Sequence, residues 1–132
     1  MQINQSTDYA IRMVLYLARA AQPVPSSKLS DAIGVSPRYL LQIGSRLRDG
    51  GLIIASHGPN GGYELSKKPK EITLLDIIRI MERRTAFLFC VASTENMRNS
   101  SVLDTVYHSI NTMVTNELEK ITLESLLFNT TE

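Results

Sequence analysis

The chain has 132 residues, of which 43% are apolar and 20% charged, so it can bury the core of one domain and is too short for two. This composition excludes a disordered chain, and the lack of a signal-peptide pattern or of about 18 successive apolar residues predicts a cytoplasmic protein outside the membrane. A single cysteine, Cys90, excludes an intramolecular disulfide and agrees with a reducing compartment.

The net charge of +1 conceals a division between two parts of the chain. Residues 1–84 contain 12 Lys or Arg against 7 Asp or Glu, whereas residues 85–132 contain 2 against 6. Such an asymmetry indicates that the first part meets a polyanion, although basic residues that merely solvate the surface would give the same count.

The first predicted helix covers residues 5–20 and is apolar nearly all round, interrupted only by Asp8, Arg12 and Arg19. A helix without a wide polar face is buried on more than one side, and a second subunit is the expected source of part of this cover. After a loop with two prolines, Ser26 or Ser27 is expected to cap a short helix through Ile33, with Leu29, Ala32 and Ile33 facing inward.

A third helix is predicted from Ser36, whose hydroxyl suits an N-cap, to the glycine pair Gly50-Gly51, which suits a helix end. Pro37 fits its first position, where no N–H is required. Its inner stripe consists of Leu40, Ile43, Gly44 and Leu47, and its opposite side carries Arg38, Leu41, Gln42 and Ser45. Together with the preceding helix and a glycine-containing turn it forms a helix-turn-helix pattern, and its outer side suits the major groove of DNA.

Two short strands, 52–55 and 63–65, are predicted next, on either side of a turn rich in glycine. A helix-turn-helix followed by such a hairpin is a winged helix. Its tip, with His57, Gly58 and Asn60, is expected to reach a neighbouring groove or phosphate. An exposed loop histidine without a role is the alternative for His57.

The remaining chain is predicted to hold three helices around an irregular connection at 85–100. Thr73 and Asp76 form a capping-box pattern for a helix to about residue 84, with Leu74, Ile77, Ile78 and Met81 inside. A long helix over about 102–118 and a short one over 122–128 follow. The long helix has a stripe that requires a partner, and we expect dimerisation through Val102, Val106, Ile110, Met113, Val114 and Leu118.

The predicted fold is therefore mainly α with a small β-hairpin, a winged helix-turn-helix plus a long C-terminal dimerisation helix. Residues 1–84 form the DNA-binding domain, and residues 85–132 form a connector and dimerisation helix within the same compact unit.

The sequence resembles the Rrf2-type winged-helix transcriptional regulators, which include IscR, NsrR and CymR. The resemblance covers about residues 1–128. The matching pieces are Asp8-Tyr9-Ala10-Ile11-Arg12, Tyr39-Leu40 with Gln42-Ile43, Leu47, Gly51-Leu52, Gly58 with Gly61-Gly62-Tyr63, Ile72-Thr73-Leu74 and Ile121-Thr122-Leu123. It implies a homodimer that binds a partly palindromic double-stranded DNA operator, with one recognition helix in each half-site.

The departures from the family pattern concern the cofactor and the DNA contacts. Sensor members resemble one another in three closely spaced cysteines after the fourth helix, where this chain has Cys90 alone. An iron–sulfur cluster takes four protein ligands, chiefly thiolates, so we expect no cluster, no metal and no other cofactor. Leu41 replaces an acid that cluster-containing members often carry, and His57 replaces a common wing arginine, so the operator is expected to differ.

The expected function is sequence-specific transcriptional regulation as a homodimer, with repression as the expected mode. Gln42 can pair with an adenine edge and Leu41 with a thymine methyl, while Arg38 can read guanine or hold a phosphate. The expected DNA-binding residues are Lys28, Ser36, Arg38, Tyr39, Leu41, Gln42, Arg46, His57, Gly58 and Asn60.

Several alternatives remain open at the level of sequence. An enzyme is not expected, because the chain has no nucleophile–base pair and no ligand cluster. A winged helix that binds a protein instead of DNA is the main rival. Cys90 is either a redox switch or a buried small hydrophobe. A small-molecule effector and a protein partner are both compatible with the sequence as regulatory signals.

Overall fold

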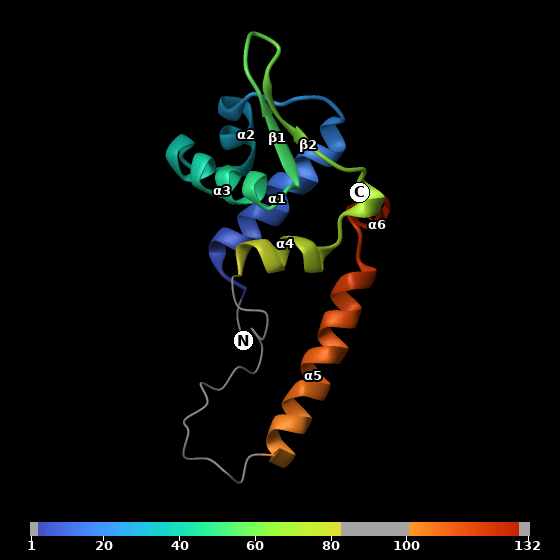
Figure 1. Ribbon diagram of the computed structural model, residues 1–132. Helices are drawn as coiled ribbons and strands as arrows, with labels where there is room; N and C mark the ends of the chain where they lie inside the picture. Colours follow the sequence, from blue (N-terminus) through green and yellow to red (C-terminus); the bar gives the residue numbers. More distant parts are fainter. Residues whose placement is uncertain (1–2, 83–100, 130–132) are drawn as a thin grey trace.

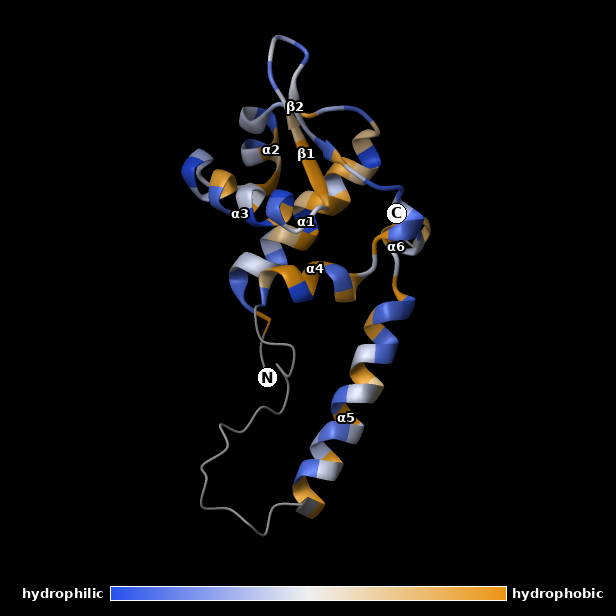
Figure 2. Cartoon of the chain, in the orientation of Figure 1, coloured by the Kyte–Doolittle hydropathy of each residue, from blue (hydrophilic) through white to orange (hydrophobic). Residues whose placement is uncertain are grey.

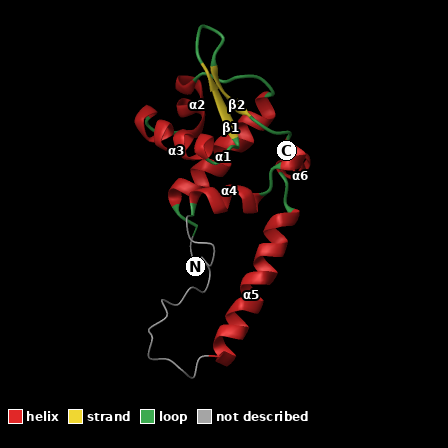
Figure 3. Cartoon of the chain, in the orientation of Figure 1, coloured by secondary structure: helices red, strands yellow, loops and turns green. Residues whose placement is uncertain are grey.

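The computed structural model describes residues 3–82 and 101–129, and it confirms the predicted fold class of a mainly helical chain with one small hairpin (Figures 1 and 3). The elements in chain order are α1 (Gln5–Ala20), α2 (Ser26–Ile33), α3 (Pro37–Asp49), β1 (Ile53–Ser56), β2 (Gly62–Leu65), the 3-10 turn η1 (Pro69–Glu71), α4 (Leu74–Met81), α5 (Ser101–Lys120) and α6 (Leu123–Asn129).

Helix α1 lies at the centre of the body and contacts α2, α3, α4, α6 and β2. Ala10, Met13, Val14 and Leu17 are buried on it, which explains why this helix is apolar nearly all round. The cover that we expected from a second subunit is supplied largely by elements of the same chain. The polar exceptions Asp8, Arg12 and Arg19 lie at the surface.

Helix α2 ends at Ile33 as predicted, but its N-cap is Pro25, which makes no side-chain cap, rather than Ser26 or Ser27. The prediction of its inner face was wrong at one position. Ala32 is exposed, and the buried residues are Leu29 and Ser30. Ser30 can turn inward because its hydroxyl donates a hydrogen bond to the carbonyl of Ser27 at 3.0 Å, which satisfies its polar group within the helix. The inward side is therefore rotated toward Ser30 and away from Ala32.

The hairpin is antiparallel, with Ile53 opposite Leu65 and Ala55 opposite Tyr63. Tyr63 also pairs with Val24, since each backbone N–H donates to the other residue's carbonyl at 2.9 Å. A Cβ atom on Gly62, whose φ is 149°, would lie 2.2 Å from the Val24 carbonyl oxygen. A glycine is required before Tyr63 because the backbone of the 22–25 loop approaches so closely there.

Helix α4 begins with the predicted capping box. The Thr73 hydroxyl accepts from the Asp76 N–H at 3.2 Å, and the Asp76 carboxylate accepts from the Thr73 N–H at 3.0 Å. Its buried residues are Leu75, Ile77, Ile78 and Met81, whereas Leu74, which we expected inside, is half-buried. Leu74 is instead the first residue of the helix, and its N–H donates a hydrogen bond to the carbonyl of Ile121 at 2.9 Å.

The end of the described chain returns to the winged-helix body. The N–H of Leu123 donates to the carbonyl of Ile72 at 2.9 Å, and the Leu123 side chain is fully buried in the common core. Helix α6 consequently packs against α1 and η1.

Helix α5 projects from the body, with its carboxyl end next to the body (Figure 1), and it carries the apolar residues that we expected to dimerise. Val102, Val106 and Met113 are exposed, with 73%, 46% and 65% of their surface accessible. Ile110, Val114 and Leu118 are half-buried. The single stripe of the sequence is thus divided into an exposed part and a partly covered part. Cys90 lies outside the described residues. Within residues 3–82 and 101–129, no helix combines the length and apolarity that a membrane span demands.

Candidate nucleic-acid interface

Helix α3 is held by its N-cap and by four small or apolar residues. The Ser36 hydroxyl accepts from the N–H of Tyr39 at 3.1 Å, and Pro37 occupies the first turn, as predicted. Leu40, Ile43, Gly44 and Leu47 are buried. Each apolar side chain of this stripe contributes about 1.5–3 kcal/mol when it leaves water, so the helix has one strongly preferred rotation.

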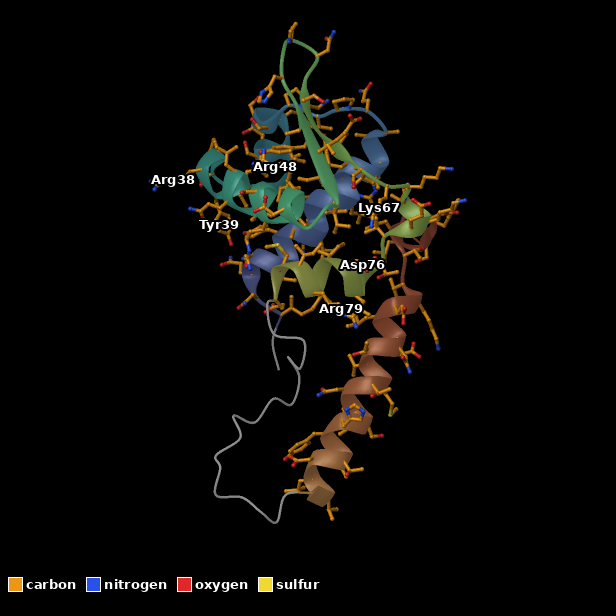
Figure 4. All side chains as sticks on the ribbon, viewed as in Figure 1. Arg38, Tyr39, Arg48, Lys67, Asp76 and Arg79 are labelled. Atoms are coloured by element: carbon orange, nitrogen blue, oxygen red, sulfur yellow. The ribbon has the colours of Figure 1, made fainter. Side chains whose placement is uncertain are left out.

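This rotation leaves a polar and cationic face outside. Arg38 and Gln42 are exposed, and Leu41 is 54% exposed between them. Figure 4 shows Arg38 projecting outward from the beginning of the helix. Asp49, in the last position, is the only acid on α3, so the face has an excess of positive charge.

A hollow of about 420 Å³ lies between α3, the beginning of α2 and the hairpin. Its lining residues are Pro25, Ser26, Leu41, Arg48, Ala55, Ser56, His57, Gly58, Gly61, Gly62 and Tyr63. Of the residues predicted to bind DNA, the hollow brings together Leu41, His57 and Gly58. Lys28, Arg38, Gln42 and Asn60 do not line it, and all four are exposed on the surrounding elements.

Arg48 and Ser26 line this hollow and were absent from the predicted site. For Arg48 a signal was available, because it stands seven residues after Leu41 and two helical turns bring such residues onto one face. Ser26 gave no comparable signal, since its place in the hollow depends on how α2 packs against the hairpin.

Two other residues that were predicted to contact DNA, Tyr39 and Arg46, interact with other elements of the chain. The ring of Tyr39, a half-buried residue, meets the ring of Tyr9 edge-on, with centroids 5.8 Å apart and an interplanar angle of 88°. The guanidinium of Arg46, also half-buried, donates through Nη2 to the carbonyl oxygen of Met81 at 2.5 Å. The first interaction connects α3 to α1, and the second connects α3 to α4.

The described residues do not offer a metal centre. Residues 3–82 and 101–129 contain no group of three or more His, Cys, Asp or Glu side chains that could hold a metal ion. The chain has one cysteine, whereas an iron–sulfur cluster takes about four protein ligands, chiefly thiolates.

A helix-turn-helix with a cationic outer face, followed by a hairpin across a shared hollow, defines the winged-helix class of transcriptional regulators. The profile of the Rrf2 family, described as iron-dependent transcriptional regulators, matches residues 3–129. The chain belongs to the Rrf2 family of transcriptional regulators, and it is a regulator rather than an enzyme.

Individual relatives agree with this assignment. The chain is 31% identical over 132 residues to the HTH-type transcriptional regulator IscR of Pectobacterium atrosepticum, covering 98% of this chain and 80% of that protein. Among solved structures it resembles IscR of T. potens, with a TM-score of 0.80, 25% identity, and 99% and 89% of the two chains covered. It also resembles CymR, the global cysteine regulator of B. subtilis, with a TM-score of 0.76, 26% identity and 99% of each chain covered.

Proposed function

We propose that the chain is a homodimeric repressor that binds a specific DNA operator without an iron–sulfur cluster. The observation that carries the proposal is the outer face of α3, where Arg38 and Gln42 are exposed beside the hollow under the hairpin. Gln42 can pair with an adenine edge and Leu41 can contact a thymine methyl in the major groove. Arg38 serves as a guanine reader or a phosphate contact.

The phosphate contacts are proposed around these reading residues. Five residues are proposed to fix the register of the protein on the duplex. They are Lys28, Ser36, Tyr39, Arg46 and Arg48, the last of which lines the hollow. The hairpin tip, with His57, Gly58 and Asn60, reaches the neighbouring groove. A repressor acts by occupying its operator, so the proposed repression needs no contact beyond those that bind DNA.

The proposed dimer uses the exposed part of the α5 stripe, Val102, Val106 and Met113. Three large apolar side chains on one side of a projecting helix gain stability when a second copy covers them. Two α3 helices in a two-fold pair would then read the two halves of a palindrome.

We propose the absence of an iron–sulfur cluster because the chain has only one cysteine. Even two chains together provide two cysteines, fewer than the four ligands a cluster takes. Anaerobic reconstitution with iron and sulfide should leave no bound sulfide and should not change DNA affinity. Stoichiometric sulfide on the purified dimer would contradict this part.

Selection of bound sites from random duplex DNA tests the central proposal, and it should yield two half-sites related by a dyad. Binding to the selected site should weaken steeply as salt rises, because several phosphate contacts release counterions. A winged helix that binds protein instead of DNA would give no enriched motif. Reporter expression with the selected site between promoter and gene should fall when the regulator is present.

A further inference from the structure

The carboxyl end of α4 is bound from two sides by other elements of the body. On one side, Arg46 of α3 donates to the Met81 carbonyl at 2.5 Å. On the other, the Glu82 carboxylate accepts from the Asn4 N–H at 3.0 Å, the Asn4 amide at 3.1 Å and the Thr7 hydroxyl at 2.9 Å. Met81 and Glu82 thereby connect α3 to the beginning of α1.

The chemistry of this junction favours a fixed geometry. The Met81 carbonyl is among the last of α4, where helix carbonyls lack partners within the helix and carry the negative end of the dipole. A guanidinium is therefore a matched donor. Thr7 is fully buried, so loss of its acceptor on Glu82 would leave a polar group without water.

We infer that Arg46 is a positioning residue, which sets the orientation of α3 through the carboxyl end of α4, rather than a contact to a DNA phosphate. This inference rests on the proposed DNA binding and replaces one of its phosphate contacts. Arg48, two positions later, is exposed and lines the hollow, so it remains the phosphate contact of this part of the helix.

The two roles predict different responses to substitution. Removal of a phosphate contact weakens binding uniformly across DNA sequences and lowers the slope of log affinity against log salt by about 1. Loss of a positioning contact tilts the reading side chains, so it weakens binding to the operator more than binding to scrambled DNA and leaves the salt slope unchanged.

The experiment compares R46Q with the matched control R48Q in the full-length chain, on the selected operator and on a scrambled duplex over a range of salt. For R46Q we expect operator affinity to fall at least fivefold more than scrambled-DNA affinity, at unchanged slope. For R48Q we expect equal losses on both duplexes and a slope lower by about 1. Equal losses with a reduced slope for R46Q, or no loss on either duplex, would overturn the inference.

A second pair of variants keeps the inference testable if R46Q does not fold. R46K keeps the charge, so a phosphate contact would retain most of its affinity, whereas a positioning residue that needs the guanidinium reach would not. E82Q lies at the same junction and should reduce the operator-to-scrambled ratio without a change in slope. If both retain the wild-type ratio, the inference is wrong, while a selected operator motif would leave the proposed function intact.

Discussion

Helices α3 and α5 both leave one side uncovered, and the two uncovered sides differ in chemistry. The outer face of α3 presents Arg38 and Gln42, whereas that of α5 presents Val102, Val106 and Met113. Figure 2 shows the apolar positions of α5 along a helix that stands apart from the body. A cationic, hydrogen-bonding surface suits a polyanion, and an apolar one suits another apolar surface. Exposure alone therefore does not identify a partner, whereas the chemistry of the exposed face does.

The largest expected effect comes from placing a charge on the exposed α5 face. M113E would bury a carboxylate in the proposed dimer contact, and an uncompensated buried charge costs about 3–5 kcal/mol. Sedimentation velocity should then show a monomer, and affinity for a two-half-site operator should fall far more than affinity for a single half-site.

The matched control for this variant is H108E. His108 is exposed on the same helix but on the side away from Val106 and Met113. H108E should remain dimeric. Dimers in both variants would show that the exposed apolar face of α5 is not the contact between subunits.

The next largest effect is expected on the outer face of α3. Q42A should cost about 1–3 kcal/mol on the operator and relax base preference at one position in each half-site, because the paired hydrogen bonds to an adenine edge are lost. Fluorescence anisotropy on operator and scrambled duplexes measures both affinities. Equal losses on the two would show that Gln42 reads no base, and an unchanged dimer mass is the control.

A smaller effect is expected at Gly44, where α3 touches the hairpin. A Cβ atom there would lie 3.1 Å from the Tyr63 ring, closer than an ordinary contact, while alanine favours a helix by about 1 kcal/mol. G44A should therefore change the free energy of unfolding little but move the hairpin relative to α3. We expect a severalfold loss of operator affinity, measured beside a urea denaturation curve. Wild-type affinity at wild-type stability would contradict this prediction and show that operator binding does not depend on how closely the hairpin packs on α3 at this point.

The sequence predicted the elements of this comparison better than the contacts between them. The periodicity of residues 5–20 predicted α1, and the periodicity and the Ser36 cap predicted the bounds and the outward face of α3, because these signals are local. The bridges of Val24 with Tyr63 and of Thr73 with Thr122 join distant residues singly, so they leave no periodic pattern. Arg46 and Arg48 are equally basic in sequence, and the fold gives them different surroundings: Arg46 contacts the end of α4, whereas Arg48 is exposed and lines the hollow.

Leu41 provides the smallest and sharpest test, because it is the apolar exception on the cationic face. It is 54% exposed beside the hollow, so its side chain contributes little to the folded core. If it covers a thymine methyl, L41A should weaken operator binding by about 1 kcal/mol, the amount expected for modest apolar burial, and should leave the dimer and the salt slope unchanged. If it is an apolar contact for another protein instead, L41A should leave operator affinity as it is. The outer face of α3 would then bind DNA through its polar residues and a protein through Leu41. The contrast between α3 and α5 would hold only for the polar and charged residues of α3.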